Sequence, residues 1–176
     1  MKKLLIVVDM QNDFITGVLG TPEAQAILPT VTAHIRARRT EGYTLLATLD
    51  THGENYLHTQ EGTRLPVPHC IRGTQGWAIH PDVKASLGDC PLVEKPTFGS
   101  PDLPGIVAAL AGPEQDLTIE LLGVCTDICV VSNALMLKAH FPHATVQVKA
   151  DCCAGVTPAK HQAALETMAS CQIDII

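Results

Sequence analysis

Residues 121–131 read LLGVCTDICVV and join a mostly apolar run to a segment with helical spacing. The run covers 117–124, and apolar side chains recur at helical intervals over 128–139. A strand that passes through a tight turn into a helix presents side chains at the carboxyl edge of an α/β sheet. The stretch therefore predicts an α/β fold in which this turn carries cysteine side chains.

Cys125 and Cys129 stand in this turn, and the residues alone leave open which of them is reactive. We expect Cys129 in the first turn of the helix, where the dipole and exposed N–H groups favour the thiolate. Backbone N–H groups near both cysteines can receive an oxyanion. The competing interpretation is that both are small buried hydrophobic residues, the commonest role of cysteine in an apolar segment.

Strands and helices alternate outward from this stretch along the chain. Further strands are expected at 3–8, 43–49, 92–94, 145–150 and, as an edge strand, 172–176. Helices are expected at 24–40, within 77–87 from about residue 80 or 81 onward, at 103–111 and at 158–170, with loops at 51–76 and 151–155. The alternation predicts a single domain, residues 1–176, with three α/β/α layers around a mainly parallel, doubly wound sheet.

Composition limits the class of function. The net charge is −6 and the longest basic cluster is the short run at 36–39, which argues against a nucleic-acid-binding surface. No apolar run has the length of a membrane span, and the N-terminal run is too short for a signal peptide. Seven cysteines fit a reducing compartment better than a disulfide framework, so a cytoplasmic protein is expected.

Charged side chains follow three of the predicted strands. Asp9, Asp50 and Lys95 each stand at a strand end, and parallel strands bring these ends to the edge that carries the two cysteines. There a carboxylate can take a thiol proton and return it to a leaving amine, while an ammonium group favours the thiolate. The arrangement predicts a nucleophilic cysteine that attacks a carbonyl group.

The loop at 51–76 carries a second group of candidate residues. Asp50 and His52 are separated by one residue, His69 lies on the far side of the loop, and Glu61 lies between them. An Asp/His/His set with open positions suits a zinc, manganese or iron ion. The alternative is that the histidines make ordinary hydrogen bonds within the loop.

Five segments in order resemble the motifs of the isochorismatase-like cysteine hydrolases. They read LLIVVDMQNDF, LDTH, PVPHCIRGTQG, VEKPTFGS and LLGVCTDICV, and they span about residues 3–156 without a large insertion. The Asp-x-His and Pro-x-His patterns resemble those of the nicotinamidases (pyrazinamidases) within that superfamily. The resemblance implies an amidase that converts nicotinamide to nicotinate and ammonia through a cysteine thioester.

The resemblance also implies a role for each matching residue at the sheet edge. Asp9 corresponds to the general base, Lys95 to the catalytic lysine and Cys129 to the nucleophile. A cis peptide bond is implied at Val124–Cys125, which turns the N–H of Cys125 toward that of Cys129 to form the oxyanion hole.

The loop residues acquire roles in the same way. Asp50, His52 and His69 correspond to ligands of a divalent metal, zinc before manganese or iron, which holds the ring nitrogen of the substrate. Glu61 stands where some members supply a fourth ligand, and Phe14 where members have an aromatic wall of the substrate site. Because members are commonly dimers or tetramers, a homo-oligomer acting on a small amide is expected.

The chain departs from the nicotinamidase pattern at three positions. Thr51 stands where a Trp is frequent, and Leu65 and Val67 stand where an aromatic residue is frequent. A related hydrolase acting on another small amide, a carbamoyl compound or a ureide is therefore the main alternative. The isochorismate-cleaving branch is disfavoured because it uses no nucleophilic cysteine. A non-catalytic binding protein of the same fold predicts a damaged catalytic set, and here that set is intact.

Other reactive residue types receive structural interpretations. Asp13 is expected to hydrogen-bond within its own loop, and Asp127 to cap the helix that starts at 128. Trp77 fits either the core or the wall of the site. The remaining cysteines are interpreted as packing residues or bystanders: Cys70, Cys90, Cys152, Cys153 and Cys171.

Overall fold

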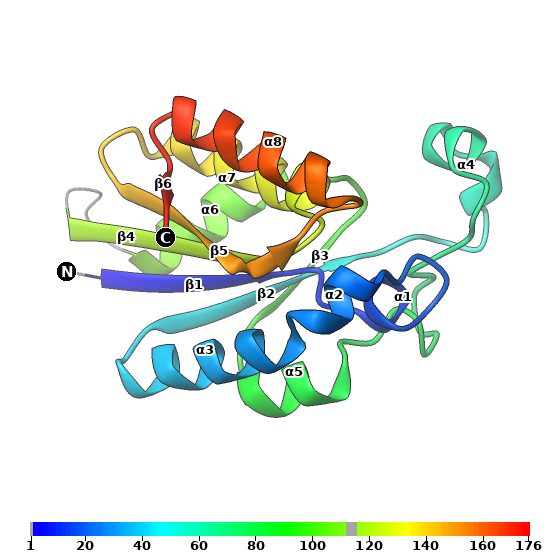
Figure 1. Ribbon diagram of the computed structural model, residues 1–176, viewed down its shortest axis with the longest axis horizontal. Helices are drawn as coiled ribbons and strands as arrows, with labels where there is room; N and C mark the ends of the chain where they lie inside the picture. The colour runs from blue at the N-terminus through cyan, green and yellow to red at the C-terminus, as the bar shows by residue number, and fades with distance from the viewer. Residues whose placement is uncertain (1, 112–115) are drawn as a thin grey trace.

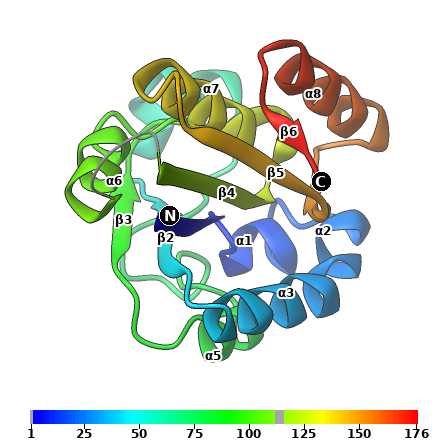
Figure 2. The ribbon, with the colours of Figure 1, turned by 90° about the vertical axis from the view of Figure 1, so that its left-hand side faces the viewer.

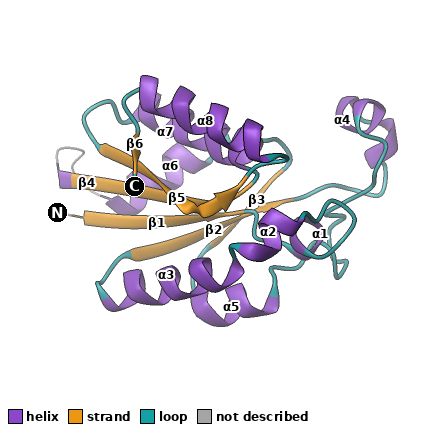
Figure 3. Ribbon diagram, in the orientation of Figure 1, coloured by secondary structure: helices purple, strands orange, loops and turns teal. Residues whose placement is uncertain are grey.

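The computed structural model describes residues 2–111 and 116–176. A six-stranded sheet with the order β3-β2-β1-β4-β5-β6 forms its centre, and each strand is parallel to its neighbours (Figure 3). The strands are β1 (Lys2–Val8), β2 (Thr44–Asp50), β3 (Leu92–Lys95), β4 (Leu117–Val124), β5 (Thr145–Ala154) and β6 (Asp174–Ile175). The predicted α/β fold is confirmed, with β6 at an edge as expected.

Helices cover both faces of the sheet (Figures 1 and 2). One layer contains α3 (Leu28–Thr40) and α5 (Pro81–Leu87), which pack on each other. The other layer contains α6 (Leu103–Ala111), α7 (Val131–His140) and α8 (Pro158–Ser170). The strand order reverses between β1 and β4, and open α/β sheets form their sites in the crevice beyond such a point.

The two central strands are buried on both faces. Every residue from Leu4 to Val8 in β1 has no exposed surface, and the β4 side chains of Ile119, Leu121 and Leu122 are equally buried. A continuous aliphatic run, without polar alternation, is what a parallel strand between two helical layers requires. The core is therefore aliphatic and rigid at the point where the strands deliver Asp9 and the cysteine turn.

The helix expected at 24–40 is two helices, α2 (Pro22–Ala26) and α3. The hydroxyl of Thr21 accepts a hydrogen bond from the N–H of Ala24 and caps α2. Pro29 then stands in the first turn of α3, where its missing N–H costs nothing. The break was not visible in the sequence because apolar residues at helical spacing continue across it, from Ile27 and Leu28 to Val31.

The loop expected at 151–155 is wrong, because β5 continues to Ala154. The β4–β5 register shifts between Leu121 and Gly123, after which Gly123 pairs with Cys153. Cys152 and Cys153 are buried, as their interpretation as packing residues requires. The Asp-Cys-Cys sequence resembles a turn, but pairing with β4 beyond the irregularity extends the strand.

The long segment at 51–76 contains two short helices at Tyr56–His58 and α4 (Gln60–Arg64). Figure 1 shows α4 beyond the carboxyl ends of the strands, away from both helical layers. The helix expected within 77–87 from about residue 80 or 81 is confirmed as α5, which begins at Pro81. Among the described residues, no helix is long and apolar enough to cross a membrane.

Candidate active site

The chain leaves β4 through a wide turn before α7 begins. The Val124–Cys125 peptide bond is cis, as the family resemblance implies, and residues Thr126–Val130 form one π-helical turn. The N–H of Val130 donates to the carbonyl oxygen of Cys125 at 3.1 Å. Cys129 therefore lies in this turn and not, as expected, in the first turn of an α-helix.

A glycine allows β1 and β4 to approach closely just before this turn. Gly123 has φ +127°, and a Cβ atom built on it would lie 2.1 Å from the carbonyl oxygen of Val8. No side chain fits in that space. The close approach brings the residue after Val8, which is Asp9, to the same crevice as the cysteine turn.

Asp9, Lys95 and Cys129 lie in one buried cluster at the carboxyl edge of the sheet. Lys95 Nζ lies 2.6 Å from Asp9 Oδ2 and 3.5 Å from Cys129 Sγ. The hydroxyl of Thr48 donates to Asp9 Oδ1 at 2.6 Å. A second carboxylate, Asp50, lies 3.4 Å from Lys95 Nζ. The ammonium group therefore lies close to two carboxylates and a thiol in a water-poor pocket.

Burial dominates the electrostatics of this cluster. Burial raises the pKa of Asp9 above its ordinary value, although the charge of Lys95 opposes the shift. Burial would lower the pKa of Lys95, but the negative charges around it raise it instead. Burial, and then the charge of Asp9, raise the pKa of the Cys129 thiol well above its usual value. The direction of this shift is opposite to the one expected from a helix dipole.

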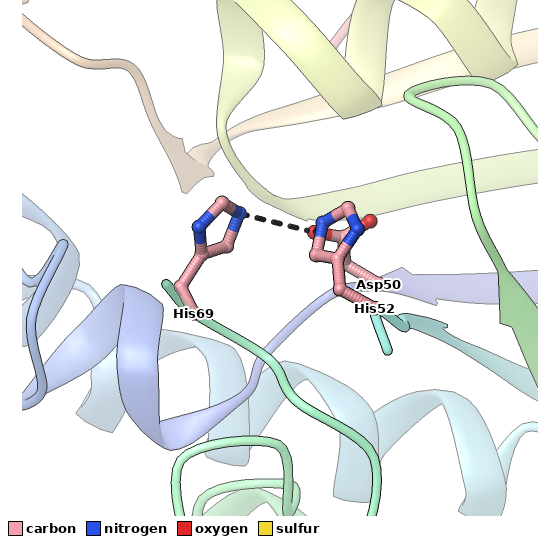
Figure 4. A group of neighbouring side chains, drawn as sticks. All are labelled: Asp50, His52 and His69. Carbon is pink, nitrogen blue, oxygen red and sulfur yellow. Dashed lines mark hydrogen bonds and ion pairs between the residues drawn. The ribbon is translucent and has the colours of Figure 1, made fainter. Parts of the chain in front are cut away.

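Asp50, His52 and His69 converge beside this cluster, each offering one ligand atom within 4.8 Å of the others (Figure 4). Asp50 Oδ2 lies 3.0 Å from His52 Nε2 and 3.5 Å from His69 Nε2. Glu61, on α4, places Oε1 3.7 Å from His52 Nε2 and 3.6 Å from His69 Nε2. The structure thus brings the four expected metal ligands together.

The donor set fits a divalent cation. His69 Nδ1 donates to the carbonyl oxygen of Val67 at 2.8 Å, so Nε2 is the ring nitrogen that faces Asp50 and could bind a metal after losing its proton. Burial would raise the pKa of Asp50, but hydrogen bonds from His52 and His69 hold it below its usual range. Two imidazoles and an ionised carboxylate with room for further ligands form a set that zinc, manganese and iron accept.

Residues of both groups line one cavity of about 280 Å³. They are Cys129 of the first cluster, with its neighbour Cys125, and Asp50, Glu61 and His69 of the second. The remaining wall is largely apolar, and it includes Phe14, Leu65, Phe98 and Ile128. Phe14 packs edge-on against the His69 ring, with centroids 5.5 Å apart. The cavity is of the size and character that holds one small, flat, mostly apolar molecule.

Two acidic residues make contacts that differ from those expected. Asp127 does not cap its helix, because its Oδ1 accepts a hydrogen bond from the N–H of Val156 at 2.9 Å. Asp13 does not bond within its own loop, because its Oδ2 accepts from the N–H of Cys70 at 2.8 Å. Both carboxylates join segments that are distant in sequence, which local spacing does not reveal.

Sequence reasoning missed Thr48 and Gln11. Both are fully buried polar residues, and both bond to residues of the site. For Thr48 the available signal was a polar side chain within an otherwise apolar run, whereas Gln11 stands among other polar residues and carries no such signal. Trp77 is half-buried and its indole N–H donates to the Thr51 hydroxyl at 2.8 Å, so it supports the metal-ligand strand from outside the cavity wall.

Comparisons with known proteins place this geometry in a family. The model of the isochorismatase domain matches residues 3–176. A nicotinamidase/pyrazinamidase of Mycobacterium tuberculosis is 25% identical over 190 residues, which cover 99% of this chain and 98% of that protein.

Solved structures agree with this assignment. The pyrazinamidase of Pyrococcus horikoshii, crystallised in complex with zinc, is 29% identical, with a TM-score of 0.83 over 100% of this chain and 99% of that one. An N-carbamoylsarcosine amidase of Thermoplasma acidophilum is 25% identical, with a TM-score of 0.78 over 99% and 95% of the chains. With its parallel sheet, its cis peptide bond and its cysteine turn, the chain belongs to the isochorismatase domain family of hydrolases.

Proposed function

We propose that this hydrolase is a metal-assisted cysteine amidohydrolase that converts nicotinamide and water to nicotinate and ammonia. The observation that carries the proposal is the contact of Lys95 with both Asp9 and Cys129, because Cys129 lines a cavity. Two of the candidate metal ligands, Asp50 and His69, line the same cavity. A substrate held between the two groups would present a carbonyl carbon to sulfur.

In the first step Asp9 takes the thiol proton and Cys129 Sγ forms a bond to the amide carbon. The raised pKa of both groups supports this role, because a protonated thiol needs a base and a basic carboxylate is a better one. The ammonium group of Lys95 offsets the developing negative charge. The backbone N–H groups of Cys125 and Cys129 receive the oxyanion.

In the second step the C–N bond breaks, and Asp9 gives its proton to the leaving nitrogen, so that ammonia departs and a thioester remains. Water then attacks the thioester carbon while Asp9 takes one of its protons. The C–S bond breaks, the proton returns to Cys129, and nicotinate leaves. Each proton taken by Asp9 is thus returned within the cycle, and the sum is hydrolysis of one amide bond.

Asp50, His52 and His69 would hold a divalent metal, and we propose zinc, with Glu61 as a further ligand. Such an ion would supply a positive anchor for the ring nitrogen of the substrate. The pyrazinamidase of Pyrococcus horikoshii was solved with zinc, which supports this choice. Phe14 would form the aromatic wall beside the ring, because it lines the cavity next to His69.

The test is release of ammonia from nicotinamide by the purified protein. Cys129→Ala removes the nucleophile and is expected to abolish release. Cys171→Ala is the matched control, because Cys171 is exposed and lies outside the cavity. Full activity of Cys129→Ala, or no activity of the wild-type chain on nicotinamide, contradicts the proposal.

The second candidate is hydrolysis of another small amide, a carbamoyl compound or a ureide by the same residues. The cavity wall favours it at one position, because Leu65 provides an aliphatic surface where nicotinamidases often have an aromatic one. The likeness to an N-carbamoylsarcosine amidase also supports it. Comparison of kcat/KM across nicotinamide, pyrazinamide and carbamoyl amino acids separates the two, since the preferred class will show the highest value.

A further inference from the structure

We propose that Gln11 and Asp13 are positioning residues for the metal site, because their side chains hold the backbone segments that carry the ligands. This inference rests on the metal site proposed above. Neither side chain belongs to the ligand set, and neither lines the cavity. Gln11 contacts the backbone of the ligand Asp50. Asp13 contacts the backbone of Cys70, which follows the ligand His69.

Gln11 binds the peptide groups of Asp50 at two points. Its Nε2 donates to the carbonyl oxygen of Asp50 at 2.8 Å, and its Oε1 accepts from the N–H of Asp50 at 2.8 Å. Nε2 also donates to the carbonyl oxygen of Trp77 at 2.8 Å. Gln11 is fully buried, so water cannot replace these bonds. The amide group therefore fixes both the position and the rotation of the ligand's backbone.

Asp13 acts on the second segment. Its Oδ2 accepts from the N–H of Cys70 at 2.8 Å, directly after the ligand His69. Cys70 is fully buried and has φ +46°, an uncommon backbone conformation for a residue with a side chain. Its carbonyl oxygen accepts from the N–H of His52 at 3.0 Å. The peptide groups of Cys70 thus connect Asp13 to the backbone of both histidine ligands.

The structure around Asp13 leaves its carboxylate little freedom. A Cβ atom built on Gly76 would lie 2.2 Å from one carboxylate oxygen, and the N–H of Asp13 donates to the carbonyl oxygen of Gly76 at 3.0 Å. Asp9, two residues before Gln11, forms the ion pair with Lys95. Three alternate residues of one short segment therefore have different partners. Asp9 contacts Lys95 of the nucleophile cluster, Gln11 contacts Asp50 at the end of β2, and Asp13 contacts the loop that carries His69.

This arrangement predicts that loss of either side chain weakens metal binding. A metal site needs its ligand atoms within a few tenths of an ångström of their best positions, and loss of an outer contact usually costs 10–100-fold in affinity. A merely structural hydrogen bond would lower stability with and without metal equally. The two roles therefore differ in the dissociation constant of the metal and not only in the melting temperature.

The experiment measures the dissociation constant of Zn²⁺ alone, by competition with a chromophoric chelator, on the full chain. Asp13→Ala and Gln11→Met are expected to raise it about 10–100-fold. Asp13→Asn keeps a neutral acceptor and is expected to restore part of the affinity. Asn12→Ala is the matched control, because Asn12 lies between Gln11 and Asp13 and its Nδ2 donates to the carbonyl oxygen of Gln75. The Zn²⁺ dissociation constant of this variant should stay within about twofold of the wild-type value.

Circular dichroism and the melting temperature of the metal-free proteins identify any variant that fails to fold. If Gln11→Met fails to fold, the inference is tested by the Zn²⁺ dissociation constants of Asp13→Ala and Asp13→Asn. Equal Zn²⁺ affinity of the wild type, Asp13→Ala and Asp13→Asn would overturn the inference and leave the metal site in place. A wild-type chain that binds no Zn²⁺, with ammonia release unchanged, would overturn both this inference and the metal part of the proposed function.

Discussion

Lys95 Nζ lies 2.6 Å from Asp9 Oδ2, and neither side chain is exposed to solvent. Lys95 is the last residue of β3 and Asp9 directly follows β1, and β2 separates these two strands in the sheet. Because both charges have left water, each depends on the other for its stability in the fold. The pair thus links the stability of the sheet edge to the chemistry proposed for it.

A double-mutant cycle measures this dependence. Lys95→Met leaves the Asp9 carboxylate buried without its main counterion, and we expect a loss of about 3–5 kcal/mol in the free energy of unfolding. Asp9→Asn/Lys95→Met removes both charges and is expected to lose less than the sum of the single changes. Urea denaturation gives the values. Additive losses would show that the ion pair is not coupled in the folded protein.

Metal binding is expected to stabilise the folded chain, because Asp50, His52 and His69 converge only after folding. At a zinc concentration about 100 times the dissociation constant, the gain is about 2.7 kcal/mol. Chelator treatment should therefore lower the melting temperature, and added Zn²⁺ should restore it. A His52→Ala/His69→Ala variant is the control, whose melting temperature should not respond to either treatment.

The close approach at Gly123 predicts the effect of an added methyl group. In Gly123→Ala the new Cβ would meet the carbonyl oxygen of Val8, at a backbone conformation unsuited to alanine. We expect a loss of about 3 kcal/mol or more. Gly105, exposed on α6 with no atom near its would-be Cβ, is the matched control.

Gly105→Ala should stabilise the protein by about 0.5–1 kcal/mol through its better helix propensity. Urea denaturation of both variants gives the comparison. Equal stability of Gly123→Ala and the wild type would contradict the close approach of β4 to β1 at Gly123.

A single buried carboxylate away from the site, that of Glu120, predicts a pH dependence of stability. Glu120 in β4 is fully buried and accepts hydrogen bonds from His34 and Arg38 of α3 and from Gln147 of β5. Burial would raise the pKa of Glu120, but these partners, Arg38 first, lower it below its ordinary value of 4.5. The ionised carboxylate therefore stabilises the fold above that pH, and the contribution is lost as pH falls further.

Glu120→Gln removes the charge and is expected to cost about 1–3 kcal/mol at about pH 7, because Arg38 loses its buried partner. The difference between wild type and Glu120→Gln should shrink as the pH falls below 4.5. Urea denaturation across this range provides the measurement. A difference that is constant with pH would contradict the role assigned to Glu120.

The sequence by itself determined the class of fold and predicted the charged, histidine and cysteine residues that the fold brings together. The buried strands read as apolar runs such as LLIVV, and charged residues at their ends mark the carboxyl edge of the sheet. The family resemblance then selected Cys129 over Cys125. These inferences depend on local patterns and on the order of motifs, both of which can be recognised in the sequence without knowledge of the packing.

Only the tertiary structure decided the strand order, the extension of β5 to Ala154 and the burial that raises the pKa of Cys129. It also showed that Gln11 and Asp13 bond to the backbone of Asp50 and Cys70. The physical reason is the same in each case. Strand register, burial and hydrogen bonds between distant segments depend on how the whole chain packs, and no local spacing encodes them.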